Sequence, residues 1–112
     1  MTVNFGDFGA ARPRQGDIWW AETEGKRRPV LVVTRDSVIG RLTRVVVAPI
    51  TSRVRNIPTE LSLGPEEGLA GECAASFDNL VVLPVSLLVE RVGEVGFANS
   101  RICEAVTAMA DC

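Results

Sequence analysis

The pattern of apolar and polar residues divides the chain into short β-type runs followed by one segment of helical period. The runs are rich in Val, Ile and Thr and are separated by Gly, Pro and charged residues, which is typical of strands joined by turns. We predict strands at residues 16–21, 28–34, 43–50, 59–63, 73–83 (with a bend at Phe77-Asp78) and 89–95. The polar stretch 22–27, the connection 35–42, the Gly/Pro/Glu loop 64–71 and the short turn 84–88 join them.

The last part of the chain has a different period. Ile102, Val106 and Met109 recur at i, i+4 and i+7, as on one face of a helix, and Asn99 or Ser100 is a suitable N-cap. Short strands, short connections and one terminal helix predict a mainly β fold, a small and strongly bent barrel or a partly opened sheet. Because such a barrel leaves a strand edge or an apolar face uncovered, we expect the chain to associate with itself.

Length and composition fit one folded domain. The 112 residues are 46% hydrophobic and 23% charged, which excludes a disordered chain and allows one core. We expect residues 1–13 to form a flexible lead-in and residues 14–112 to form a single domain. No stretch approaches the roughly 20 apolar residues of a membrane span, and the N-terminus lacks a signal-peptide pattern. We therefore expect a cytoplasmic protein with no membrane association.

The cysteines do not indicate a metal site or a disulfide framework. Cys73, Cys103 and Cys112 are far apart, no CxxC is present, and the chain contains no histidine. This pattern favours reduced and mostly buried thiols, with the terminal Cys112 exposed. We expect neither a metal nor another cofactor.

The net charge of −2 conceals an uneven distribution of charged residues. Residues 1–55 hold ten Arg or Lys against five acidic residues, and residues 56–112 hold two Arg against nine acidic residues. Nine of the ten cations in the first half are Arg, whose planar guanidinium suits phosphate contacts and base stacking. The split predicts a localised anion-binding surface, unless folding disperses these charges over all faces.

The candidate catalytic side chains lie at the ends of two apolar runs. Arg28 opens one run, and Thr51-Ser52 close the other, with Arg53 and Arg55 directly behind. A guanidinium and a hydroxyl on neighbouring strands are groups that bind a phosphate and stabilise the negative charge that develops on it during a reaction. Taken singly, each also fits a surface arginine or a turn-forming hydroxyl. Without histidine, any chemistry here proceeds without the usual neutral-pH proton carrier.

Two residue pairs suit contacts with nucleic acid. Trp19 and Trp20 point to opposite faces of one strand, so one is expected in the core and the other as a stacking platform for a base. We choose Trp19 for the stacking role. Asp78-Asn79 supply a carboxylate and an amide that read base edges by hydrogen bonds, although the same residues at a strand bend also favour a turn.

Five segments in order resemble one known family. They are GDIWWAE, RRPVLVVT, VVVAPITS, IPTEL and FDNL, and together they resemble the MazF/PemK family of toxin–antitoxin endoribonucleases over roughly residues 14–110. The resemblance implies a small SH3-like barrel of the CcdB/PemK type, with a terminal helix, working as a homodimer.

The resemblance also implies a reaction and partners. The reaction is metal-independent, sequence-selective cleavage of single-stranded RNA that leaves 2′,3′-cyclic phosphate and 5′-hydroxyl ends and inhibits translation and growth. The partner is a MazE-like antitoxin whose acidic or amphipathic tail covers the RNA groove. By position, Arg28 and Thr51 match the family's catalytic residues. The candidates for RNA binding are Trp19, Arg27, Ser52, Arg53, Arg55, Asp78 and Asn79.

The chain departs from the family pattern at two places. The turn 22–27 is short, so Glu24 is not assigned as a catalytic acid. Val81 and Val82 stand where the family often has a basic and a hydroxyl residue, and Arg27 is expected to compensate. Since an arginine is a poor general base at neutral pH, we assign Arg28 to charge stabilisation and leave the general base open.

Two other functions remain open at this point. One is a toxin of the same architecture that binds gyrase and cuts nothing, as CcdB relatives do. The other is a non-catalytic SH3-like module that binds RNA or protein. The fold does not separate these functions, but a gyrase binder has no need of Arg28 together with Thr51.

Overall fold

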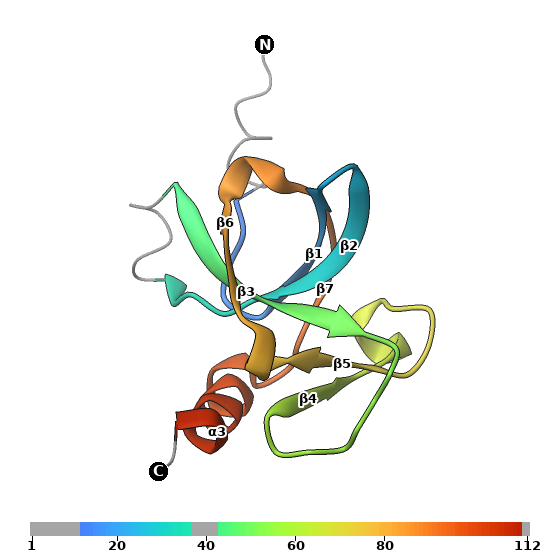
Figure 1. The fold of residues 1–112 in the computed structure, drawn as a ribbon, viewed down its shortest axis with the longest axis vertical. Helices are drawn as coiled ribbons and strands as arrows, with labels where there is room; N and C mark the ends of the chain where they lie inside the picture. Colours follow the sequence, from blue (N-terminus) through green and yellow to red (C-terminus); the bar gives the residue numbers. More distant parts are fainter. Residues whose placement is uncertain (1–11, 37–42, 111–112) are drawn as a thin grey trace.

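The computed structural model describes residues 12–36 and 43–110. They form a seven-stranded antiparallel sheet that curls on itself, with one helix beside the strands β4 and β5 (Figure 1). The strands are β1 (Asp17–Thr23), β2 (Lys26–Val32), β3 (Arg44–Thr51), β4 (Glu60–Leu63), β5 (Cys73–Ser76), β6 (Val81–Pro84) and β7 (Leu88–Glu94), and the helix is α3 (Ala98–Ala110). Short 3₁₀ helices lie at Pro65–Glu67, Phe77–Asn79 and Val85–Leu87. The predicted fold class, mainly β with a C-terminal helix, is confirmed.

The strand β3 is the branch point of the sheet. Its first residues, Arg44 to Val47, pair with β6, and Val47 to Pro49 pair with β2 on the other side, whereas its last residues, Ile50 and Thr51, pair with β5. The order of the sheet is β4-β5-β3-β2-β1-β7, with β6 also beside β3. A strand that passes from one set of neighbours to another makes a corner, and this corner curls the sheet.

The β1–β2 connection is tighter than the expected turn 22–27. Only Glu24 and Gly25 form the turn, with φ of 50° and 75°, while Thr23 pairs with Lys26. Two consecutive residues with positive φ match the twist of an antiparallel hairpin, so the strands continue to the turn. The second strand therefore begins at Lys26, two residues before the predicted start.

The expected single strand 73–83 is two strands. The chain turns at Phe77–Asn79 between β5 and β6 because the Phe77 side chain is fully buried and draws the backbone toward the core. β5 pairs with β3 and β4, whereas β6 pairs with β3. The bend predicted at Phe77-Asp78 thus separates two strands that pair with different parts of the sheet.

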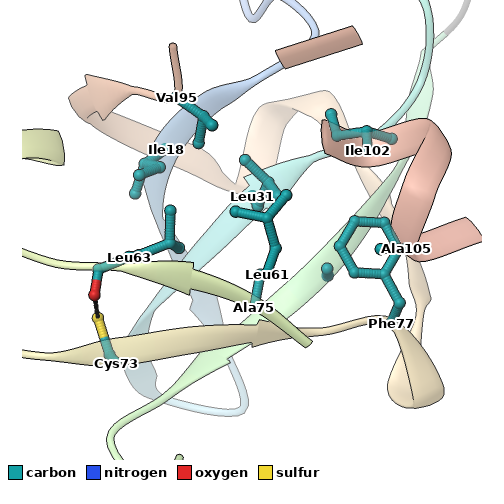
Figure 2. Close-up of a cluster of buried hydrophobic side chains, with 11 residues drawn as sticks. Ile18, Leu31, Leu61, Leu63, Cys73, Ala75, Phe77, Val95, Ile102 and Ala105 are labelled. Atoms are coloured by element: carbon teal, nitrogen blue, oxygen red, sulfur yellow. Dashed lines mark hydrogen bonds between the residues drawn. The ribbon is translucent and has the colours of Figure 1, made fainter. Parts of the chain in front are cut away.

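Both faces of the central strands are buried. One cluster contains Ile18, Leu31 and Ala48 together with residues of β4, β5 and α3 (Figure 2). The other contains Trp19 and Val30 with residues of β3, β6 and β7. Strands buried on two sides carry continuous apolar runs, which explains why these segments show no clean alternation.

The helix α3 packs on the first cluster through Ile102 and Ala105. It begins at Ala98, so neither Asn99 nor Ser100 is its N-cap: the left-handed Phe97 (φ 54°) precedes the helix, which starts at least two residues earlier than expected. Met109, predicted on the apolar face, is 41% exposed because it lies beyond the end of the core contact.

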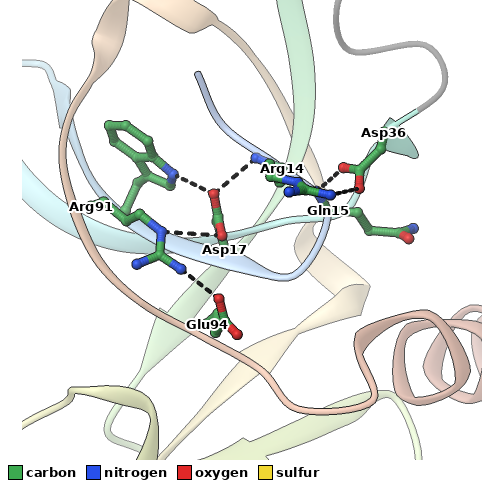
Figure 3. Close-up of polar contacts among 7 residues, drawn as sticks. Arg14, Gln15, Asp17, Asp36, Arg91 and Glu94 are labelled. Carbon is green, nitrogen blue, oxygen red and sulfur yellow. Dashed lines mark hydrogen bonds and ion pairs between the residues drawn. The ribbon is translucent and has the colours of Figure 1, made fainter. Parts of the chain in front are cut away.

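The entry of the chain into the sheet is held by Asp17, a buried carboxylate (Figure 3). It accepts hydrogen bonds from the Arg14 backbone N–H (2.9 Å), the Trp19 indole N–H (3.3 Å) and the Arg91 guanidinium (3.3 Å). A buried carboxylate with three donors is satisfied. Asp17 therefore joins the start of the domain to β7.

Cys73 is a buried free thiol, as predicted, but Cys103 is a free thiol on the surface of α3. Cys112 and most of the predicted lead-in lie outside the described residues. Within the described part of the chain, no helix has the length and apolar character needed to cross a membrane.

Candidate active site

Arg28 and Thr51 lie at the end of the β2–β3 ladder, two residues beyond its last pair. Val30 pairs with Pro49, and in an antiparallel ladder each step back on one strand is a step forward on the other. Val30–Pro49 is the last pair of the ladder, and the same register extended by two residues would set Arg28 opposite Thr51, with both side chains on the same face. The Arg28 side chain is exposed and Thr51 is half-buried. The two candidate catalytic groups thus lie just beyond the last β2–β3 pair, where β3 turns to pair with β5.

The hydroxyl of Thr51 is held in one orientation. Its Oγ1 accepts a hydrogen bond from the Arg53 backbone N–H at 3.0 Å, and its backbone pairs with Ala74 of β5. With the oxygen already accepting, the hydroxyl proton is left to donate outward. A donor fixed in this way suits a non-bridging phosphate oxygen.

The arginines near this site differ in their partners. Arg27 forms an ion pair with Glu90 (3.0 Å), and its guanidinium carbon lies 5.9 Å from the ring centre of Trp20. Among the described residues, neither Arg28 nor Arg53 has a carboxylate partner within ion-pair distance. Two guanidiniums without an acidic partner among the described residues make this corner of the sheet a candidate anion-binding site.

A hollow of about 580 Å³ opens on the other face of the same strands. Trp20 and Pro29 pair across β1 and β2, and Ile50 continues this row on β3. Ser52 lies at this hollow, so the predicted site residues of the 51–53 segment divide between the two faces. The remaining lining residues come from the loop after β4, from β5 and from β7; they are Gly68, Leu69, Ala70, Gly71, Glu72, Cys73 and Val92.

The choice of Trp19 as a stacking platform is wrong. Trp19 is 3% exposed, packs in the second core cluster with Ala21 and Val30, and donates its indole N–H to Asp17. A ring enclosed by the core has no free face for a base. Trp20, which points to the other side of the strand and lines the hollow, is the accessible tryptophan.

Arg55 and Asp78 belong to a separate cluster. Arg55 binds Glu60 through its backbone N–H (2.8 Å) and its guanidinium (3.1 Å), and it lies 3.8 Å from Asp78. Asp78 also accepts the hydroxyl of Thr59 at 2.7 Å. These contacts close the loop between β3 and β4. The two residues therefore already have protein partners, and their role in RNA binding stays a prediction.

The environment of Glu60 stabilises its charged form. Its carboxyl pKa is held below the usual value, first by the hydrogen bond from the Arg55 backbone N–H, and further by the Arg55 guanidinium and the Asn56 backbone N–H. These effects outweigh burial of the side chain, which acts in the opposite direction.

Asn79 is exposed, and its side-chain amide donates to the Ser76 hydroxyl at 2.9 Å. No contact in the described part of the chain joins it to Arg28 or Thr51. Glu24 lies at the exposed tip of the β1–β2 hairpin. The described residues include no group of three or more His, Cys, Asp or Glu side chains able to hold a metal ion.

Comparison with known proteins identifies the family. The model of the family described as "PemK-like, MazF-like toxin of type II toxin-antitoxin system" matches residues 14–109. The chain belongs to this family. The Mycobacterium tuberculosis protein named "Probable endoribonuclease MazF5" is 37% identical over 105 residues, which are 91% of this chain and 96% of that protein.

Solved structures agree with this membership. The structure titled "Mycobacterium tuberculosis toxin MazF-mt6" superposes with a TM-score of 0.74 at 36% identity, covering 81% of this chain and 92% of that one. A mycobacterial endoribonuclease solved with its cognate antitoxin has the same fold, with a TM-score of 0.75 at 24% identity over 89% and 97% of the two chains. The resemblance to the MazF/PemK family is confirmed.

Some residues of this MazF/PemK-type site were not found from sequence. Trp20 and the segment from Gly68 to Glu72 line the hollow, but the sequence shows only a tryptophan pair and a Gly-rich loop. The alternation of the first strand indicated that one tryptophan is accessible. It did not indicate which one, because both faces of that strand are apolar.

Proposed function

We propose that this chain cleaves single-stranded RNA at a site formed by Arg28 and Thr51, and that the 2′-hydroxyl next to the scissile phosphate is the attacking group. The family is one of toxins of type II toxin–antitoxin systems, and curated relatives are named endoribonucleases. The observation that supports the residue assignment is the β2–β3 register, which places Arg28 opposite Thr51 when it is extended two residues beyond the Val30–Pro49 pair.

The two side chains have complementary roles in this proposal. The guanidinium of Arg28 neutralises the charge that develops on the phosphorane, and the Thr51 hydroxyl donates to a non-bridging oxygen and fixes the phosphate. The 2′-hydroxyl loses its proton to a base that is not assigned, and its oxygen forms a bond to phosphorus in line with the leaving 5′-oxygen. The P–O5′ bond breaks and the 5′-oxygen takes up a proton, which leaves a 2′,3′-cyclic phosphate and a 5′-hydroxyl. A metal ion has no assigned step in this scheme, because the guanidinium supplies the positive charge.

Single-stranded RNA is the substrate that fits this geometry. A regular duplex holds the 2′-oxygen out of line with the leaving group, whereas a splayed strand reaches the in-line arrangement. Arg53 contacts a neighbouring phosphate, and Arg27 with Trp20 offers a charged and aromatic surface to the bases.

A type II toxin has a protein antitoxin as its partner. We expect an acidic or amphipathic segment of this antitoxin to cover the Arg28–Thr51 site, because unpaired guanidiniums attract carboxylates as they attract phosphates. We also expect a homodimer. Val81 and Val82 on β6 are 41% and 56% exposed, and a second copy would cover them. We place the action of the toxin in the cytoplasm.

The test is incubation of the purified protein with a long single-stranded RNA in the presence of EDTA. Discrete fragments with cyclic-phosphate and 5′-hydroxyl ends are expected. The Arg28→Ala variant is expected to leave most of the RNA uncut over the time in which the wild type cleaves it. Intact RNA with the wild-type protein would favour the binding functions, and gyrase inhibition assayed in parallel would separate a CcdB-like toxin from an RNA- or protein-binding module.

A further inference from the structure

The hollow beside the active site is apolar except at its rim. Its lining includes Trp20, Pro29 and Ile50, and the polar residues Ser52 and Glu72 also belong to it. An aromatic surface with a few polar groups at fixed positions is the usual construction of a site for a planar, partly polar ligand. An unpaired nucleobase is a ligand of that kind.

The wall that carries Glu72 is held by close backbone packing. A Cβ atom on Gly93 of β7 would collide with the Glu67 carbonyl oxygen, and one on Gly68 would lie 2.7 Å from the Val92 carbonyl oxygen. The Glu67 carboxylate also accepts the Gly64 backbone N–H. The loop after β4 is thus docked directly on β7. Glu72 follows this loop and precedes Cys73, whose strand pairs with β4.

The hollow lies one residue away from the proposed cleavage groups on each strand. Pro29 and Ile50 line it, whereas Arg28 and Thr51 point to the other face, and Ser52 joins the two sides. Because Ser52 follows Thr51 directly and lines the hollow, a single strand of RNA held by Arg28 and Thr51 would bring a neighbouring base to the hollow if it passes over Ser52 at the end of β3.

From these observations we propose that Glu72 is a specificity-determining residue, and that its carboxylate selects a base carrying an amino group in the hollow next to Trp20. An ionised carboxylate only accepts hydrogen bonds. Guanine presents adjacent N–H donors, and adenine and cytosine each present an amino group, whereas uracil has no amino group and its single N3–H lies between two carbonyl oxygens that the carboxylate repels. One position beside the cut is therefore selective against uracil. This proposal rests on the proposed function.

The carboxylate also favours RNA over an acidic peptide as the occupant. Glu72 and the nearby Glu67 place negative charge beside the hollow, and both raise the pKa of the Cys73 thiol, although less than burial does. An acidic antitoxin segment gains nothing from entering such a site. A base with N–H donors gains hydrogen bonds.

The experiment maps 5′-hydroxyl ends on a pool of random-sequence RNA cut by the wild-type protein, Glu72→Gln and Glu72→Ala. The matched control is Glu66→Gln, which removes the same charge from the same loop at an exposed residue outside the hollow. We expect the wild type and the control to discriminate against uracil at one position. Both Glu72 variants should lose this discrimination by about 5-fold or more, the lower end of what one good polar contact to a base contributes.

The outcomes separate this proposal from the proposed function. A wild-type protein that cuts RNA with the same base preference as both Glu72 variants overturns the role of Glu72 and leaves the endoribonuclease assignment standing. An RNA pool that the wild type leaves intact overturns both. Affinity for the antitoxin measured on the same variants provides a second readout: an antitoxin whose binding weakens in Glu72→Ala, with cut sites unchanged, shows that the hollow serves the antitoxin and overturns the proposal.

Discussion

Replacing Arg28 by alanine tests the proposed active site most directly. The Arg28 side chain is exposed and has no ion-pair partner among the described residues, so its removal leaves the core and the ladder unchanged. Surface substitutions of this kind change the free energy of unfolding by about 0.5 kcal/mol or less. A loss of cleavage in a variant with unchanged thermal unfolding then reports on the chemistry.

The size of the expected loss follows from the exposure of the site. Two unit charges about 4 Å apart interact by about 1 kcal/mol in water and about 4 kcal/mol near a protein surface. Removal of one preorganised donor to a developing oxyanion costs about 10²–10³ in rate in known enzymes. Because Arg28 lies at an open corner of the sheet, we expect about a 100-fold loss, toward the lower end of that range.

The assay measures kcat/KM on a fluorogenic single-stranded RNA with EDTA present. Arg28→Lys keeps the positive charge but loses the planar guanidinium, so we expect its rate to lie between those of Arg28→Ala and the wild type. Lys26→Ala is the matched control, because Lys26 is an exposed cation two residues away on the same face of β2. The control should change the rate by less than about 5-fold, as expected for an exposed charge without a partner. A folded Arg28→Ala protein that cuts within about 5-fold of the wild type would refute the assignment.

Three other predictions address neighbouring groups. Thr51→Val removes the hydroxyl at nearly constant volume and should lower kcat about 10- to 100-fold, whereas Thr51→Ser should retain most activity; equal rates for the two would contradict the role of the hydroxyl. Glu60 has a pKa below its usual 4.5, so its stabilising effect is present above pH 4.5 and is lost as pH falls through the lower folded value. Chemical denaturation at several acidic pH values should therefore show a steep loss of stability that is weaker in Glu60→Gln, and parallel curves would refute this. Finally, burial raises the pKa of the Cys73 thiol, so a thiol reagent followed by peptide mass spectrometry should modify the exposed Cys103 first. Equal rates of modification at Cys73 and Cys103 would contradict the protection of Cys73 by burial.

The local elements could be predicted from the sequence because they depend on neighbouring residues. The β-branched runs of β2 and β3 and the helical period of Ile102 and Val106 are properties of short segments. The boundaries were less accurate where a contact distant in the sequence decides them. Phe77, whose burial divides the expected strand 73–83, is the plainest case.

The residues of the candidate site were predicted only in part. Arg28 and Thr51 stand out because each marks the end of an apolar run, and the chain order of the motifs resembles a family. Which arginines are available is not a local property. Arg55 and Arg53 look alike in the sequence, yet Glu60, on the next strand, binds Arg55 and leaves Arg53 without an acidic partner among the described residues.

By itself the sequence determined the secondary-structure elements, the family and the pair of residues to be tested, since these follow from residue type and spacing along the chain. Only the tertiary structure decided which tryptophan is accessible and which residues enclose the hollow. Trp19 and Trp20 occupy equivalent places in a strand that is apolar on both faces. Their exposure depends on how the sheet curls and where the loop after β4 docks on β7, and both are set by contacts between segments far apart in the chain.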